Sequence, residues 1–72
     1  MKFNYFPETY SLYIDLSEKP SVESQEVANG VVLDFDDEGK LVGIDIDNAS
    51  KIVDLNRIES NSLPMSSFTN AL

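Results

Sequence analysis

The chain has 72 residues, with thirteen acidic residues against five basic ones, no cysteine and no histidine, and a net charge of −8. A chain of this length forms one small domain that buries only about 60% of the surface exposed by its unfolded state, so oligomerisation is a common further source of stability. The negative charge repels nucleic-acid phosphates and anionic lipids, which argues against binding to nucleic acid or to a membrane surface and leaves a basic protein as a compatible partner.

Two strands are predicted at the start of the chain. Residues 2–6 alternate aromatic and polar side chains, which places Phe3 and Tyr5 on one face. Residues 7–9 break this pattern with a proline. The alternation in residues 11–16 is stricter, and its apolar face consists of Leu12, Ile14 and Leu16. The sequence therefore predicts a second strand after a short loop.

A second hairpin is predicted around Asn29-Gly30, because both central positions of a type I′ turn need a positive φ. The hairpin joins residues 22–27 to a strand that begins at Val31, and two registers remain open. A two-residue loop sets the even-numbered residues Val22, Ser24, Glu26 and Ala28 against Val31, Leu33 and Phe35. A three-residue loop sets the odd-numbered residues Glu23, Gln25 and Val27 there instead. Neither alternative gives a clean apolar face, so we expect residues 22–27 to form an edge strand.

The stretch LDFDDEGKLVGIDI, residues 33–46, resembles a calcium-binding loop in its spacing. The liganding positions would be filled by Asp34, Asp36, Glu38, the carbonyl of Lys40 and Asp45, with Gly39 at the sharp turn. Two features argue against this site. The twelfth position normally holds a bidentate glutamate, and the flanking segments alternate as strands do whereas the motif requires helices.

Periodicity favours a hairpin with a four-residue loop at residues 36–39. In that register the pairs are Phe35 with Lys40, Leu33 with Val42 and Val31 with Ile44, which keeps the apolar residues on one face. Asp34 and Asp45 are then about 14 Å apart along the strands, whereas carboxylates that share one calcium ion lie within about 5 Å of each other. We therefore expect no metal and no other cofactor.

A helix is predicted after the second strand of this hairpin, which ends at Ile46 and is the fifth in the chain. Asp47 or Asn48 can cap it, and apolar positions recur at three- and four-residue spacing at Ile52, Val53, Leu55 and Ile58. The expected fold is a small α+β domain over residues 1–59, an antiparallel β-meander of about five strands with one C-terminal helix packed on one face. Residues 60–72 are expected to form an ordered tail that packs on a partner subunit.

The residue types limit catalytic chemistry, because the usual general base and the usual thiol nucleophile are both absent. Asp15, Asp34 and Asp45 form a candidate acidic cluster on the polar face of the sheet. Tyr13, Val32 and Leu41 are predicted on the same face, and apolar residues among acids are typical of a contact surface. With Phe68 in the tail, they make up the candidate interface. We expect a non-enzymatic interaction module that forms a homodimer through this face or the edge strand.

The segments that carry a family resemblance are Leu12–Leu16, Asn29–Asp34, Asp36–Gly39, Leu41–Ile46 and Ala49-Ser50. Over about residues 2–52 the chain resembles the small bacterial domain-of-unknown-function family 2283. Asp45 departs from the family's usual glutamate, and Tyr10 from its usual small or acidic residues. The resemblance implies a small sheet with one helix, and it brings no established activity or catalytic residues. Because some relatives are encoded beside toxin-like proteins, it also suggests an alternative role as an antitoxin-like neutralising partner of a small basic protein. A carboxylate-based ligand binder or enzyme is the remaining alternative.

The sequence has no apolar run of the roughly 20 residues that a transmembrane helix needs, and residues 1–6 lack the apolar region of a secretory signal. We therefore expect a cytoplasmic protein.

Overall fold

The computed structural model describes residues 1–57, 59 and 61. In chain order its elements are β1 (Lys2–Phe6), β2 (Ser11–Asp15), β3 (Glu23–Ala28), β4 (Val31–Phe35), β5 (Leu41–Ile46) and α1 (Ala49–Ile52). All five predicted strands are present, and their bounds differ from the expected ones by about one residue. This agreement follows from the alternation of apolar and polar side chains, which is the strongest local signal in the sequence.

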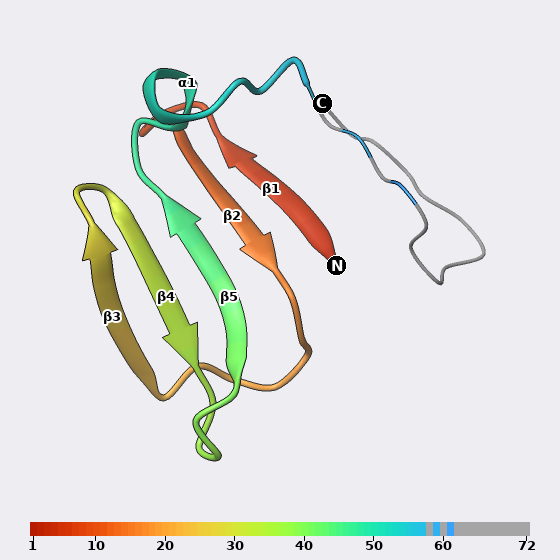
Figure 1. Cartoon of the computed structure of the whole chain (residues 1–72), viewed down its shortest axis with the longest axis vertical. Coiled ribbons are helices and arrows are strands. Elements are labelled where there is room, and N and C mark those ends of the chain that lie inside the picture. Colours follow the sequence, from red (N-terminus) through yellow and green to blue (C-terminus); the bar gives the residue numbers. More distant parts are fainter. Residues whose placement is uncertain (58, 60, 62–72) are drawn as a thin grey trace.

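The five strands form one antiparallel sheet in the order β1-β2-β5-β4-β3 (Figure 1). β3, β4 and β5 form a meander, and β1 and β2 form a hairpin that joins it along β5. The segment between β2 and β3 passes below the ends of β5 and β4 to reach the opposite edge of the sheet (Figure 1). The last of the described strands, β5, is consequently the central strand of the sheet.

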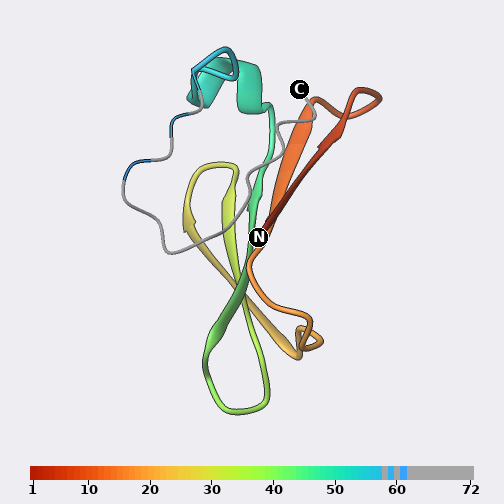
Figure 2. The same cartoon turned by 90° about the vertical axis from the view of Figure 1, so that its right-hand side faces the viewer.

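The apolar face of the sheet carries the core. Pairing of Phe3 with Ile14 and of Leu12 with Ile46 brings apolar side chains of three strands to the same side. The centre of the core consists of Leu12, Ile46 and Ala49, which is contributed by α1. Phe3, Tyr5, Ile14, Ile44, Val53 and Leu55 are partly buried against it. The core therefore lies in the β1-β2-β5 half of the sheet, beside α1 and the segment that follows it (Figure 2).

The β3–β4 hairpin combines the two registers that the sequence left open. Ala28 pairs with Val31 at the tip, as a two-residue loop requires. A bulge between Glu26 and Ala28 then shifts the pairing, so that Gln25 lies opposite Leu33 as in the three-residue alternative. The predicted type I′ turn is wrong, because Gly30 has a φ of 80° but Asn29 does not have a positive φ.

The predicted pairing of β4 with β5 is also wrong. Asp36 accepts a hydrogen bond from Gly39 and donates one to the carbonyl of Lys40, which closes a three-residue loop. A bulge next to Phe35 then shifts the pairing by one more residue, so Leu33 lies opposite Ile44, two positions from the expected partner. Because a shift by two residues keeps the side chains of the regular pairs on their faces, Leu33 and Ile44 still share the apolar side of the sheet.

The helix is much shorter than predicted, with the four residues Ala49–Ile52. Asn48 is its N-cap, but it has a left-handed backbone and its side chain makes no capping hydrogen bond. Val53 is extended, and Val53 and Leu55 both pack against the core at a spacing of two residues. An extended residue and a turn therefore bury two side chains that also fit a helical repeat. Ile58, the next residue of that repeat, lies outside the described residues, as do most of residues 60–72.

Candidate functional site

The polar face of the sheet brings together four of the residues that the sequence singled out. Tyr13 on β2 lies directly opposite Asp45 on β5. Asp15 and Asp34 lie on either side of Gly43, one on β2 and the other on β4. The three carboxylates therefore surround the side chain of Tyr13, and all three raise the pKa of its hydroxyl.

Tyr13 crosses the central strand to reach Asp34. Its hydroxyl donates a hydrogen bond to Oδ2 of Asp34 over 3.0 Å, and Ser24 donates one to Oδ1 over 2.6 Å. The tyrosine passes directly over Gly43, because a Cβ atom at that position would overlap its hydroxyl and ring. Glycine is thus the residue that lets one side chain link three adjacent strands.

Two groups of this cluster, Tyr13 and Asp45, have a raised pKa. Burial is the main cause of the raised pKa of Tyr13, and the hydrogen bond to Asp34 adds to it. Burial is also the main cause of the raised pKa of Asp45, followed by the negative charges of Asp34 and Asp47. A tyrosine that is to act as a base needs the opposite shift. The raised pKa of Tyr13 therefore gives no support for a role as a general base.

The candidate interface residues are separated by the fold. Val32 pairs with Asp45 and so shares the face of Tyr13. Leu41 pairs with Phe35 across the bulge, and Phe35 alternates to the apolar face, so the prediction that Leu41 shares the face of Val32 is wrong. The bulge causes this change because it displaces the start of β5 by one residue. Phe68 lies outside the described residues.

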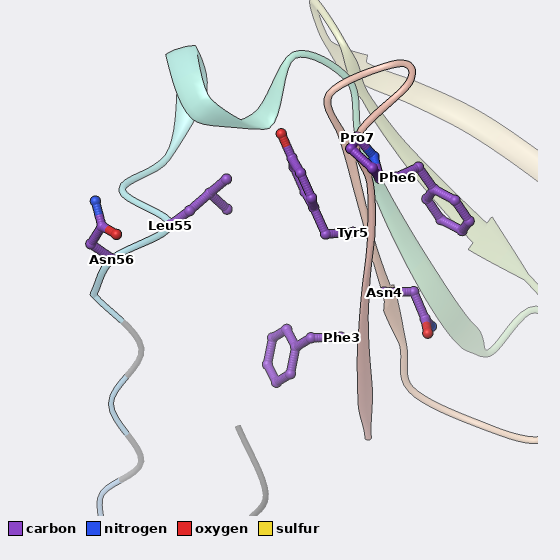
Figure 3. A pocket seen from close by; sticks show the side chains of 7 residues that line it. All are labelled: Phe3, Asn4, Tyr5, Phe6, Pro7, Leu55 and Asn56. Atoms are coloured by element: carbon purple, nitrogen blue, oxygen red, sulfur yellow. The ribbon is translucent and has the colours of Figure 1, made fainter. Parts of the chain in front are cut away.

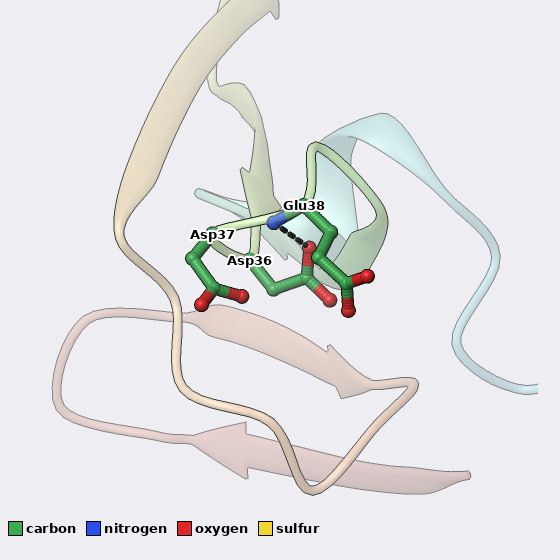
Figure 4. A group of neighbouring side chains, drawn as sticks. All are labelled: Asp36, Asp37 and Glu38. Carbon is green, nitrogen blue, oxygen red and sulfur yellow. Dashed lines mark hydrogen bonds between the residues drawn. The ribbon is translucent and has the colours of Figure 1, made fainter.

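The acidic tip of the β4–β5 hairpin groups Asp36, Asp37 and Glu38, whose carboxylate oxygens lie within 4.8 Å of one another (Figure 4). One oxygen of Asp36 accepts backbone hydrogen bonds from Glu38 over 2.8 Å and from Lys40 over 2.9 Å. The Lys19 ammonium lies 2.7 Å from Glu38 and 3.8 Å from Asp37. The three carboxylates therefore already have partners within the chain.

Asp36 has a structural position in this turn. It is only 4% exposed. Its pKa is held below the usual value mainly by the hydrogen bond from the Lys40 N–H, helped by the Glu38 N–H and by the charges of Lys19 and Lys40, while burial opposes this effect. A carboxylate that accepts two backbone N–H groups fixes the path of the loop.

The sequence reasoning missed a groove beside β1. It has a volume of about 700 Å³ and is open to solvent. Its lining residues are Phe3, Asn4, Tyr5, Phe6, Pro7, Leu55 and Asn56. Phe3 and Tyr5 point from the strand toward Leu55, whereas Asn4 and Phe6 point to the opposite side (Figure 3). A smaller hollow of about 180 Å³ lies further over the core, between Leu12 and Leu55.

The signal for this groove was present in the composition of β1, whose sequence KFNYF has three aromatic residues and no acid. Another hollow, of about 330 Å³, borders Asp15, and its other lining residues come from the N-terminus and from the chain after β2. Asp34 and Asp45 are not among those residues. Within the described part of the chain, no helix has the length and apolar character needed to cross a membrane.

The five strands and the segments that join them lie within the range of a family match. The model of a protein family of unknown function, DUF2283, matches residues 2–50, which is more than half of the chain. The chain belongs to this family. The match covers all five strands and the start of α1. No curated protein and no solved structure gives a significant match to the chain.

Proposed function

We propose that this member of the DUF2283 family is a non-enzymatic interaction module that forms a homodimer through the groove beside β1. The observation that carries the proposal is the groove itself, an open apolar surface of about 700 Å³ lined by Phe3, Tyr5 and Leu55. Open apolar surface with a polar rim is characteristic of protein contacts, and Asn56 supplies a polar side chain at this one.

The energetics of the described chain support the same proposal. Among the described residues the buried apolar ones are Leu12, Val42, Ile46 and Ala49, and of these only the small Ala49 is completely buried. A sheet with one apolar face needs a second layer to bury that face. Among the described residues that layer is α1 with the segment after it, which covers the β1-β2-β5 half of the sheet. A second subunit would add the burial that a small domain lacks.

The test is the mass of the full chain measured by sedimentation equilibrium from low micromolar to several hundred micromolar protein. We expect a concentration-dependent shift from the mass of one chain to that of two, with a dissociation constant in the micromolar range. A single-chain mass over the whole range would contradict the proposal.

A second candidate function is the neutralisation of a small basic protein, and its support is the net charge of −8. Complementary charge accelerates the encounter of two proteins and selects against partners of like charge. Affinity capture of the full chain from native lysate at low salt tests this role. Recovery of one stoichiometric basic protein that dissociates at high salt supports it, and recovery of nothing contradicts it.

A further inference from the structure

We propose that two copies of this chain join through their β1 strands, which pair antiparallel across a two-fold axis at Asn4 and make one continuous ten-stranded sheet. This inference rests on the proposed homodimer and specifies how it forms. β1 and β3 are the two edges of the sheet in the described chain, since each pairs with one neighbour. An edge strand presents unpaired backbone N–H and C=O groups, which are a template for another strand.

Charge distinguishes the two edges. β1 has no acidic residue and one lysine, whereas each of the other four strands has at least one acid. β3 carries Glu23 and Glu26, so pairing of two β3 strands would gather four carboxylates, in a chain that already has a charge of −8. A bulge also distorts β3 at Val27. Charged side chains and bulges are among the features that protect an edge from pairing, and β1 has no bulge and a single charge, at Lys2.

The sequence of β1 fits pairing with itself in one register. A two-fold axis at Asn4 sets Phe3 opposite Tyr5 of the partner subunit and Lys2 opposite Phe6 of the partner subunit, so all five residues are paired. The first pair lies on the groove side, where Phe3 and Tyr5 both point (Figure 3). Cross-strand aromatic pairs stabilise antiparallel sheets, and a lysine over an aromatic ring adds a favourable contact on the other face.

Other registers fit less well. An axis at Tyr5 sets Phe3 opposite Pro7 of the partner subunit, and proline has no N–H group to donate. An axis at Phe3 leaves Phe6 beyond the paired region. If the axis passed between two residues, a residue of the apolar face would lie opposite a residue of the polar face. The alternation of side chains does not allow this pairing when both apolar faces lie on the same side. In the Asn4 register the two grooves flank the seam on that side, each bordered by its own Leu55.

Cysteine crosslinking tests this register directly, because the chain has no cysteine of its own. The Cα atoms of directly opposed residues are about 4.5 to 5.5 Å apart, within the range of a disulfide. Asn4→Cys is therefore expected to form a covalent dimer under mild oxidation at tens of micromolar protein. Gln25→Cys on the opposite edge is the matched control, and we expect its crosslinking to be about tenfold slower.

A pair of charge variants provides a second test. Phe6 is 48% exposed and Val27 is 53% exposed, and both lie on edge strands. Phe6→Lys would set a lysine opposite Lys2 of the partner subunit at both ends of the seam, which we expect to weaken the dimer at least about tenfold. Val27→Lys makes the same chemical change on β3 and is expected to leave the dissociation constant unchanged. Circular dichroism melts of both variants show whether the fold is intact.

The outcomes separate this inference from the proposed function. If the wild-type chain sediments as a single chain, both are wrong. If the wild-type chain dimerises but Gln25→Cys crosslinks as fast as Asn4→Cys, or Val27→Lys weakens the dimer as much as Phe6→Lys, the dimer stands and its β1 seam is wrong. Selective crosslinking of Asn4→Cys together with selective weakening by Phe6→Lys supports the seam.

Discussion

At the scale of single residues, the polar face depends on the pair Tyr13 and Gly43. The tyrosine lies over the glycine and reaches Asp34, so a hydrogen bond of 3.0 Å connects strands that are not neighbours. Aromatic rings over glycine compensate for the missing side chain in a strand interior. The pair therefore explains why the central strand tolerates a glycine between Val42 and Ile44.

We predict that Gly43→Ala lowers the free energy of unfolding by about 1 to 2 kcal/mol, because the tyrosine ring must rotate away and lose its hydrogen bond. In a Tyr13→Ala background the same change is expected to cost nothing, because the space above Gly43 is then open. Urea denaturation of the two single variants and the double variant measures the coupling. Equal costs of Gly43→Ala in both backgrounds would show that the glycine is required for another reason.

A second prediction at this scale concerns Asp45, whose raised pKa means that the folded state favours the neutral carboxyl. Between the unfolded pKa, near 3.9, and the higher folded value, stability contributed by this group falls as pH rises, because the folded state binds more protons. Above the folded pKa, the free-energy cost of holding the charged Asp45 carboxylate in the folded state no longer changes with pH. Asp45→Asn should therefore raise Tm at pH 7 by about 3 °C, and the gain should vanish below about pH 4.

The control for this change is Glu8→Gln, which removes one negative charge from an exposed residue. Thermal melts by circular dichroism at pH 3 and pH 7 supply the comparison. A similar gain from Glu8→Gln would mean that relief of the overall charge, and not burial of Asp45, produces the effect.

At the scale of elements, the β4–β5 hairpin is held by Asp36. Its depressed pKa contributes stability that is fully present above the unfolded pKa of about 3.9 and is lost as pH falls through the folded pKa. We predict that Asp36→Ala lowers Tm by about 5 °C at pH 7, since two backbone N–H groups lose their acceptor. The difference from wild type should narrow in acid, where the carboxylate is protonated in both states.

Asp37→Ala is the matched control in the same turn. The Asp37 side chain is 75% exposed and its nearest cation is 3.8 Å away, so its removal is expected to change Tm by no more than about 1 °C. If both variants lose the same stability, the turn depends on its charge and not on the Asp36 hydrogen bonds.

The elements also show how far the sequence could lead. The alternation of Leu12 with Ile14 and of Leu33 with Phe35 predicts the strands and their faces, because burial on one side leaves a period of two. The alternation does not reveal a bulge, since a bulge at β5 and a shorter loop together change the partner of Leu33 from Val42 to Ile44 while Leu33 stays on the apolar face. Val53 and Leu55 fit a helical repeat, but the helix ends at Ile52, Val53 is extended and Leu55 lies in a turn, and both still pack against the core.

At the scale of the whole molecule, the excess of negative charge governs association. Two chains of charge −8 repel each other, and added salt screens this repulsion. We predict that the homodimer tightens about threefold or more between 20 mM and 200 mM sodium chloride. A complex with a basic partner should weaken over the same range, because salt screens an attraction. Sedimentation at the two salt concentrations separates the two candidate functions, and a homodimer that loosens with salt would contradict the charge argument.

Part of the candidate site could be predicted from the sequence, and the rest depends on how distant segments are placed in the whole molecule. Asp15, Asp34, Asp45 and Tyr13 share a face because alternation places them there, and the register determines which of them meet. The groove beside β1 depends on where the chain passes after α1, and nothing in the local pattern of residues 53–57 specifies that path. Long-range placement of this kind is set by the core and not by the segment itself.

The position of β5 between β2 and β4 has a consequence for how the chain is made. A nascent chain that ends before Leu41 contains the β1–β2 and β3–β4 hairpins but lacks the strand that both of them need as a neighbour. Isolated hairpins are only marginally stable in water. The sheet therefore has to assemble in one late step, after Ile46 has left the ribosome, and every shortened product of synthesis that stops earlier is exposed to proteases.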